Sequence, residues 1–113
     1  MTRRSLRHVK AIVVDQPGGP EQMQLREVPA PHPAPGEVLL DVTAAGVNRA
    51  DLLQRQGFYP PPTGASELLG LEVSGLLADE PVCALLTGGG YAEQVAVPRG
   101  QVMPLPPGMD AVT

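Results

Sequence analysis

The hydrophobic positions of this chain fall into short runs of valine, isoleucine and leucine, separated by glycine, proline and acidic residues. Runs of this length and β-branched content, with frequent turn signals between them, are typical of antiparallel barrels and sandwiches. The pattern therefore predicts a mainly β fold. Strands are expected over residues 9–15, 23–28, 37–45, 71–78, 82–86, 91–97 and 101–104.

A single segment, between Asn48 and Gly57, has the features of a helix. Asn48 is a favourable N-cap, and Asp51 stands where the acidic partner of a capping box is found. Gly57 can end the helix in the left-handed conformation common at C-terminal caps. Leu52 and Leu53 are expected to face the core. The sequence thus predicts one short helix that begins soon after the third strand.

Two proline-rich segments, residues 29–36 and 104–108, cannot be central strands because proline lacks the N–H that a sheet ladder requires. We interpret both as extended connectors, although the PxxP spacing in the first also suits an SH3 or WW partner. Asp110 follows as a suitable N-cap, so residues 109–113 are expected to start a linker helix that the chain cuts short. We therefore expect the sequence to be a piece of a longer protein.

The composition of the chain mainly excludes classes of partner and location. The 113 residues are 42% apolar and 18% charged, as in a globular domain, and the net charge of −4 argues against a nucleic-acid partner. Cys83 is the single cysteine, which favours a cytoplasmic location, and no apolar run approaches the length of a membrane span. Residues 1–8 are rich in arginine and are interpreted as a basic extension; a targeting or nucleic-acid role for them is the alternative.

Common cofactor and metal motifs are missing from the sequence. Gly88 and Gly90 have the spacing of the first two glycines of GxGxxG, but Glu93 occupies the third position, so the dinucleotide phosphate loop is not formed. The two histidines lie in the basic extension and the first proline segment, with no second imidazole at ligand spacing, so no metal site is expected. Ser74 has no nearby histidine and is interpreted as a strand residue.

A family resemblance is carried by two long stretches. They are VKAIVVDQPGGPEQMQLREVPAPHPAPGEVLLDVTAAGVNRADLLQRQGFYPPPTGASELLGLEVSG, residues 9–75, and VCALLTGGGYAEQVAVPRGQVMPLPPG, residues 82–108. Both resemble the N-terminal catalytic domain of the zinc-free quinone oxidoreductases of the medium-chain dehydrogenase/reductase superfamily, above all the p53-inducible, zeta-crystallin-like branch. The resemblance implies a GroES-like, partly open β-barrel over residues 9–108. The family's Rossmann domain, which binds NADPH and usually forms the homodimer interface, is absent.

The resemblance also implies roles for particular residues. Zinc-dependent relatives have a cysteine at the position of Asn48 and a histidine at the position of Leu71, and neither an amide nor a leucine can replace those ligands. In the zinc-free family, the residues that match Asn48 and Tyr59 lie beside the nicotinamide and the substrate, which implies catalytic and cofactor-binding roles for both. The alternatives are that Asn48 only caps the helix and that Tyr59 only packs against Pro60–Pro62. Residues 87–90, TGGG, are expected at the rim of the cleft or in a simple hairpin turn.

Residues 78–81 form a shorter connection than the family has at this place. If the short connection is real, the flanking strands join through a tight reversal, and Pro81 lies where no ladder donor is required. The alternative is that residues are missing from the sequence.

Two classes of function follow from these observations. The favoured one is the substrate-side domain of an NADPH-dependent reductase of quinones or α,β-unsaturated carbonyls, inactive alone because half of the active site is missing. The other is a stand-alone GroES-like binding or assembly module without enzymatic activity.

Overall fold

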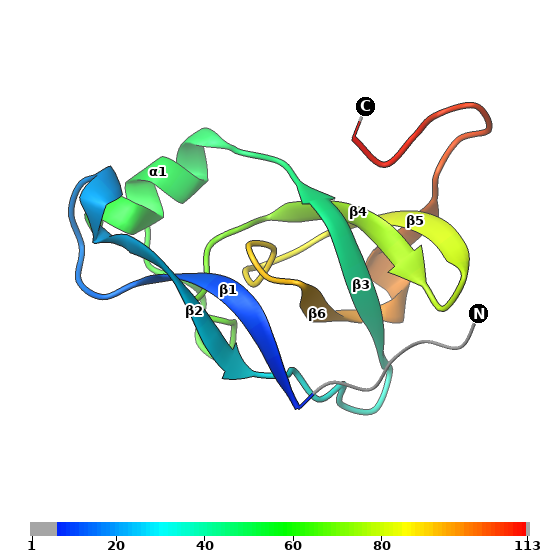
Figure 1. The fold of residues 1–113 in the computed structure, drawn as a ribbon, viewed down its shortest axis with the longest axis horizontal. Helices are drawn as coiled ribbons and strands as arrows, with labels where there is room; N and C mark the ends of the chain where they lie inside the picture. Colours follow the sequence, from blue (N-terminus) through cyan, green and yellow to red (C-terminus); the bar gives the residue numbers. More distant parts are fainter. Residues whose placement is uncertain (1–6, 113) are drawn as a thin grey trace.

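The computed structural model describes residues 7–112, which form two antiparallel sheets and one α-helix (Figure 1). The smaller sheet pairs β1 (His8–Val14) with β2 (Met23–Pro29). The larger sheet has the strand order β6-β3-β4-β5-β7. Its strands are β3 (Glu37–Ala45), β4 (Glu72–Leu77), β5 (Glu80–Leu85), β6 (Gln94–Pro98) and β7 (Val102–Pro104). The sheets curl into a partly open barrel, so the predicted mainly β architecture is confirmed.

The β1–β2 hairpin is joined to the larger sheet through the segment that precedes β6. Ala11 and Ala92 form an isolated antiparallel bridge. The N–H of Ile12 donates to the carbonyl oxygen of Tyr91 at 2.9 Å, beside this bridge. A few backbone contacts therefore close one side of the barrel where a full strand ladder is not formed.

Apolar side chains fill the interior of the barrel by the alternation that a pleated strand imposes. On β3, Val38 and Leu40 point inward and are 7% and 0% exposed, and Val95 and Val97 do the same on the neighbouring β6. Val73 on β4 and two residues of β5 complete the cluster. The full set is Val38, Leu40, Val73, Val82, Ala84, Val95 and Val97. This core fixes the register of β3 and β4, between which the candidate site begins.

Helix α1 (Arg49–Gln56) lies on the surface between the two sheets. Gly57 ends it as predicted, with φ of 91° and its N–H directed to the carbonyls of Leu53 and Gln54. The expectation that Leu52 faces the core is wrong, because its side chain is 41% exposed. The inward position of this turn is occupied by Asp51, which is 2% exposed.

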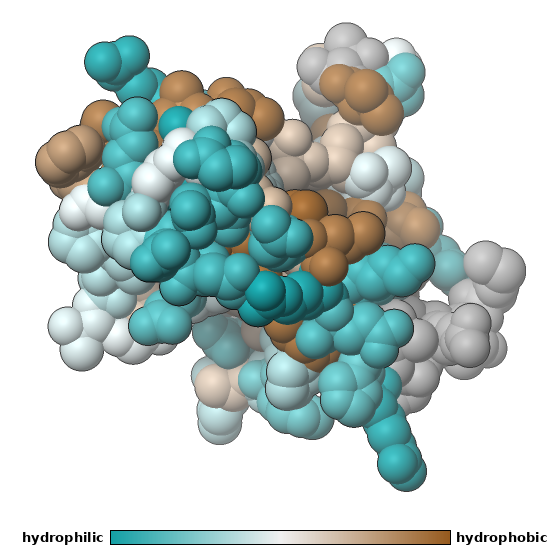
Figure 2. All heavy atoms as spheres, turned by 60° about the vertical axis from the view of Figure 1, so that its left-hand side comes forward, coloured by the Kyte–Doolittle hydropathy of each residue, from teal (hydrophilic) through white to brown (hydrophobic). Residues whose placement is uncertain are grey.

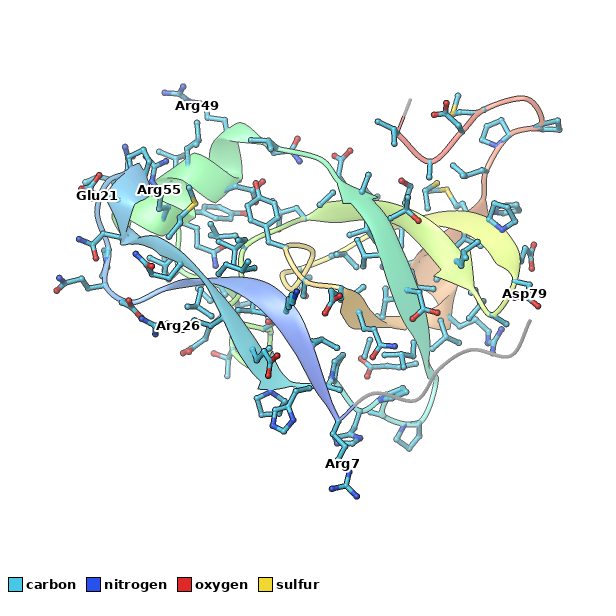
Figure 3. The ribbon with its side chains drawn as sticks, viewed as in Figure 1. Arg7, Glu21, Arg26, Arg49, Arg55 and Asp79 are labelled. Atoms are coloured by element: carbon cyan, nitrogen blue, oxygen red, sulfur yellow. The ribbon has the colours of Figure 1, made fainter. Side chains whose placement is uncertain are left out.

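The far end of α1 is tied to the loop of the β1–β2 hairpin. Arg55 Nε donates to the carbonyl oxygen of Gly18 at 3.1 Å, and the N–H of Gly18 donates back to the carbonyl of Arg55 at 2.9 Å. Figure 3 shows Arg55 on the side of α1 that faces this loop, near Glu21, whereas Arg49 projects away from the protein. These contacts hold the C-terminal end of the helix against the hairpin loop.

Strands β4 and β5 are joined by a tight hairpin, as predicted for the short connection. Leu77 pairs with Glu80, so that Ala78 and Asp79 alone make the turn, and Ala78 has a φ of 54°. In a two-residue hairpin the closing pair is hydrogen-bonded and the next pair is not. That next pair is Leu76 and Pro81, so the missing N–H of Pro81 leaves no gap in the β4–β5 ladder.

Some predicted boundaries were wrong. β6 begins at Gln94 and not at Tyr91, because the glycines before Tyr91 carry the chain across the sheet in an irregular path. Gln101 ends a short 3-10 helix (Arg99–Gln101) that precedes β7, and a second one (Pro20–Gln22) precedes β2. His8 already belongs to β1, so the basic extension predicted over residues 1–8 is shorter; residues 1–6 lie outside the described part of the chain.

The linker helix expected over residues 109–113 is not formed in the described residues 109–112. Asp110 Oδ1 instead accepts the N–H of Val112 at 3.0 Å, a local side-chain turn. So short a stretch gains too few hydrogen bonds to offset the cost of nucleating a helix.

The surface combines hydrophilic side chains with apolar patches, which Figure 2 shows in teal and brown on one face. The most exposed large apolar side chains among the described residues are Val47, Phe58 and Val112, at 73%, 77% and 79%. Val47 is next to Asn48, so the candidate site begins on an exposed part of the chain.

Candidate functional site

Asn48 lies at the junction of β3 and α1. Its backbone is extended, with φ of −121° and ψ of 157°, and its carbonyl accepts the N–H of Asp51 at 3.0 Å. The two residues form a capping box in which the N–H of Asn48 donates to Asp51 Oδ2 at 2.9 Å. The predicted N-cap position of Asn48 is therefore confirmed, and α1 starts where the sequence indicated.

The side chain of Asn48 reaches across to the first residue of β4. Asn48 Nδ2 donates to Glu72 Oε2 at 3.1 Å, and the N–H of Gly46 donates to the backbone carbonyl of Glu72 at 3.2 Å. A carboxylate can only accept, so it is the nitrogen of the amide, and not its oxygen, that faces Glu72. Sequence reasoning gave Glu72 no role, because the partners are far apart along the chain.

Asp51 is a buried carboxylate that accepts three hydrogen bonds, two from backbone N–H groups and one from a side chain. In addition to the N–H of Asn48, its Oδ2 accepts a hydrogen bond from the hydroxyl of Tyr91 at 3.0 Å, and its Oδ1 accepts one from the N–H of Gly70 at 3.3 Å. Burial, followed by the hydrogen bond and the negative charge of Asp51, raises the pKa of Tyr91 to about 12. The network fastens the start of α1 to the segments before β4 and β6.

Sequence reasoning found only one part of this network, the capping box. No local sequence pattern indicated that Asp51 is buried or that it contacts Tyr91, because the two residues are forty positions apart. Tyr91 itself was expected in a strand. Gly70, with φ of 109°, packs against Gly90 so closely that a Cβ would lie 2.6 Å from Gly90 Cα. The glycines at 70 and 90 let these two segments approach each other beside Asp51.

Tyr59 lies beyond the other end of α1. Its side chain is 47% exposed, and among residues 7–112 no hydrogen bond to its hydroxyl is formed. The eight residues of α1, about 12 Å of helix at 1.5 Å per residue, separate it from Asn48. The structure therefore does not bring Asn48 and Tyr59 into direct contact.

A cleft of about 390 Å³ opens next to the Asn48 contact. Gly46 and Glu72 form one wall, and Ser74 and Cys83 lie further along β4 and β5. Leu105, Pro106 and residues 109–112 form the opposite wall, where the hydroxyl of Ser74 donates to the carbonyl of Ala111. Ser74 is the strand residue that the sequence predicted, and its hydroxyl is occupied by this contact.

A second cleft, of about 420 Å³, lies between the β1–β2 hairpin and β6. Thr87, Gly88 and Gly89 line this cleft. Neither Asn48 nor Tyr59 lines it. The glycine-rich segment thus lies away from the cleft that Gly46 and Glu72, the neighbours of Asn48, line.

Potential metal ligands are not clustered in residues 7–112, where no group of three or more His, Cys, Asp or Glu side chains could hold an ion. Leu71 directly precedes β4, and its carbonyl accepts the N–H of Leu86 at 2.8 Å. Within the same residues, no helix is long and apolar enough to cross a membrane.

No family model matches the chain. Similar proteins include the synaptic vesicle membrane protein VAT-1 homolog of Rattus norvegicus, 35% identical over 89% of this chain and 28% of the relative. The quinone oxidoreductase of Lama guanicoe is 35% identical over 92% of the chain and 36% of the relative. The chain thus spans about a third of the length of these curated relatives.

Solved structures agree with this result. A human synaptic vesicle membrane protein VAT-1 homolog-like protein superposes with a TM-score of 0.83 at 29% identity, over 92% of this chain and 37% of that one. The quinone oxidoreductase of Thermus thermophilus, solved also with NADPH, gives 0.76 at 40% identity, over 90% of this chain and 34% of that one. The chain belongs to the medium-chain dehydrogenase/reductase superfamily. Its barrel is the GroES-like domain of that superfamily, and both the family and the fold implied by the sequence are confirmed.

Proposed function

We propose that this chain is the substrate-side domain of an NADPH-dependent reductase of quinones or α,β-unsaturated carbonyls. The observation that carries the proposal is the 40% identity, over 90% of the chain, to a quinone oxidoreductase that binds NADPH. The position of Asn48 supports it, because the amide lies at a strand–helix junction beside an open cleft. The single free cysteine supports a cytoplasmic setting.

The residues around Asn48 fit only the nicotinamide end of NADPH. Gly46 and the alanines before it leave the cleft wall without bulky side chains, and the Asn48 amide offers hydrogen bonds to a flat polar ring. A phosphate-binding GxGxxG loop is missing from the sequence, so the pyrophosphate must be held by another domain. When bound, NADPH would supply the hydride.

The chain's own contribution would be to bind and polarise the acceptor. In the proposed site, Asn48 Nδ2 donates a hydrogen bond to the carbonyl oxygen on which negative charge develops. Tyr59, beyond the far end of α1, is proposed to donate from its hydroxyl to another part of the substrate or cofactor. Asn48 and Leu71 stand where zinc-dependent relatives bind the metal, so this chemistry is proposed to proceed without zinc. Each donor that contacts the developing charge would be worth about 3 kcal/mol.

The isolated chain is expected to be catalytically silent. Correct placement of hydride donor and acceptor can supply roughly 7–11 kcal/mol of barrier reduction, and two hydrogen-bond donors cannot replace it. A fusion of this chain to the remaining part of the Thermus thermophilus quinone oxidoreductase tests the proposal. NADPH consumption with benzoquinone should appear in the fusion and not in the 113-residue chain.

Single substitutions then assign the donors. Asn48→Ala should lower kcat of the fusion roughly 100-fold, and Tyr59→Phe should lower it to a smaller extent. Glu80→Ala, an exposed change at the distant hairpin, is the control and should leave kcat unchanged. Turnover by the isolated chain would refute the proposal. If the fusion is inactive and the isolated chain forms a closed ring in native mass spectrometry, the results would favour the alternative function, a stand-alone assembly module.

A further inference from the structure

Glu72 is the partner of the Asn48 side chain, and nothing in the sequence indicated a function for it. We propose that Glu72 is a positioning residue that holds the Asn48 amide with its nitrogen available to the substrate. The catalytic consequence rests on the proposed function. The contact itself does not, since Asn48 Nδ2 lies 3.1 Å from Glu72 Oε2 in the chain alone.

The chemistry of the contact determines which way the amide faces. Asn48 Nδ2 carries two hydrogens, and Glu72 takes one, so the second remains for a ligand in the cleft. The terminal torsion of asparagine is broad and roughly two-fold, so an unrestrained amide readily turns over. After such a turn Oδ1, an acceptor, would face the acceptor oxygen of a quinone and repel it. A carboxylate at position 72 disfavours the turned state, because two acceptor oxygens would then face each other.

Gly46 gives independent support for this arrangement. A Cβ built on Gly46 would lie 2.6 Å from both Cδ and Oε1 of Glu72, so the carboxylate lies directly over the Gly46 backbone. The φ of Gly46 is not in the left-handed region, so the backbone itself does not require glycine. The missing Cβ at position 46 instead leaves the space that the Glu72 side chain occupies where it reaches Asn48.

The exposure of the contact indicates that its main role is not stability. Glu72 is exposed and Asn48 is half-buried, and hydrogen bonds and ion pairs at such positions contribute little to folding. Both Glu72 and Gly46 line the cleft of about 390 Å³. The contact therefore lies where a ligand can reach it.

The contact can be measured directly, because Asn48 is the single asparagine in the 113 residues. Selective ¹⁵N-asparagine labelling gives one side-chain NH₂ pair in the NMR spectrum, and the hydrogen-bonded proton should be shifted downfield. Glu72→Ala and Gly46→Ala should each reduce the separation of the two protons, while Glu72→Gln, which keeps an acceptor oxygen, should retain part of it. Glu80→Ala is the matched control. A Glu72→Ala spectrum with the same NH₂ pair as the control would overturn the inference.

Activity of the fusion enzyme tests the consequence. Glu72→Ala and Gly46→Ala should lower kcat about 10-fold with KM changed less than about 2-fold, since orientation and not binding is lost. Adding Glu72→Ala to Asn48→Ala should cause no further loss, because both act through one amide. A fusion that turns over but is indifferent to Glu72→Ala overturns this inference alone. A wild-type fusion without turnover overturns the proposed function, and the NMR result then decides the contact separately.

Discussion

Replacing Asp51 by asparagine should lower the free energy of unfolding by about 3–5 kcal/mol. The carboxylate is 2% exposed and accepts from Asn48 N–H, Tyr91 Oη and Gly70 N–H. An asparagine can keep the first two acceptor contacts on one oxygen, at 2.9 and 3.0 Å, but its NH₂ group then faces the N–H of Gly70. The substitution thus changes hydrogen bonding with almost no change in volume.

The magnitude follows from the two kinds of loss. A buried N–H left without an acceptor costs roughly 1–3 kcal/mol, and each remaining contact weakens by about 1 kcal/mol when its acceptor loses the charge. Tyr91→Phe removes a single hydrogen bond and should cost about 1 kcal/mol. The double variant should lose less than the sum of both, because Asp51 and Tyr91 share one interaction.

Urea unfolding followed by circular dichroism measures these differences, provided that the m-value is unchanged. Asp15→Asn is a matched control, because Asp15 also accepts two hydrogen bonds, from Arg26 at 2.5 and 2.7 Å, but on the surface. The Asp15→Asn substitution should lower the free energy of unfolding by less than about 1 kcal/mol. The reasoning about burial would be refuted if Asp51→Asn cost no more than Asp15→Asn.

Three further predictions concern other parts of the domain. Burial and Asp51 raise the pKa of Tyr91 from 10.0 to about 12. The stability that Tyr91 contributes should therefore be complete below pH 10 and be lost as the pH rises towards 12. Near-ultraviolet absorbance reports the ionisation of the tyrosine, and Tyr91→Phe should flatten this pH dependence of the free energy of unfolding. Ala78→Gly should raise the free energy of unfolding by about 0.5–1 kcal/mol, because Ala78 has a φ of 54° that glycine adopts without strain; a loss of stability in thermal or urea unfolding would contradict this. The purified protein should hold no stoichiometric zinc after dialysis, because Asn48 and Leu71 replace the two ligands, and elemental analysis decides the question.

The sequence was a good guide to those parts of the fold that local patterns specify. A run of apolar and β-branched residues between turn signals predicted β3 with the bounds that the structure shows, residues 37–45, and both edges of that strand are paired, with β4 and β6. Asn48, Asp51 and Gly57 predicted both ends of α1 because caps act over a few residues. The tight hairpin after β4 followed from the same kind of local constraint.

The errors have a common physical origin in contacts between distant segments. Leu52 was expected inside because it is apolar, but the buried side of that turn holds a carboxylate that three donors satisfy. Tyr91 was assigned to a strand, yet its hydroxyl is held by Asp51, forty positions away. The Glu72 contact with Asn48 spans 24 positions. No periodicity or motif reports such pairs, so this part of the site required the structure.

The two outer strands of the larger sheet both end in proline. β6 finishes at Pro98 and β7, which is only three residues long, finishes at Pro104. An open barrel exposes unpaired backbone groups at its edges, and such edges can recruit further strands from other molecules. A missing N–H at the end of each edge, together with the shortness of β7, limits the ladder that an incoming strand could build. The same prolines that punctuate the sequence therefore protect the incomplete barrel against aggregation.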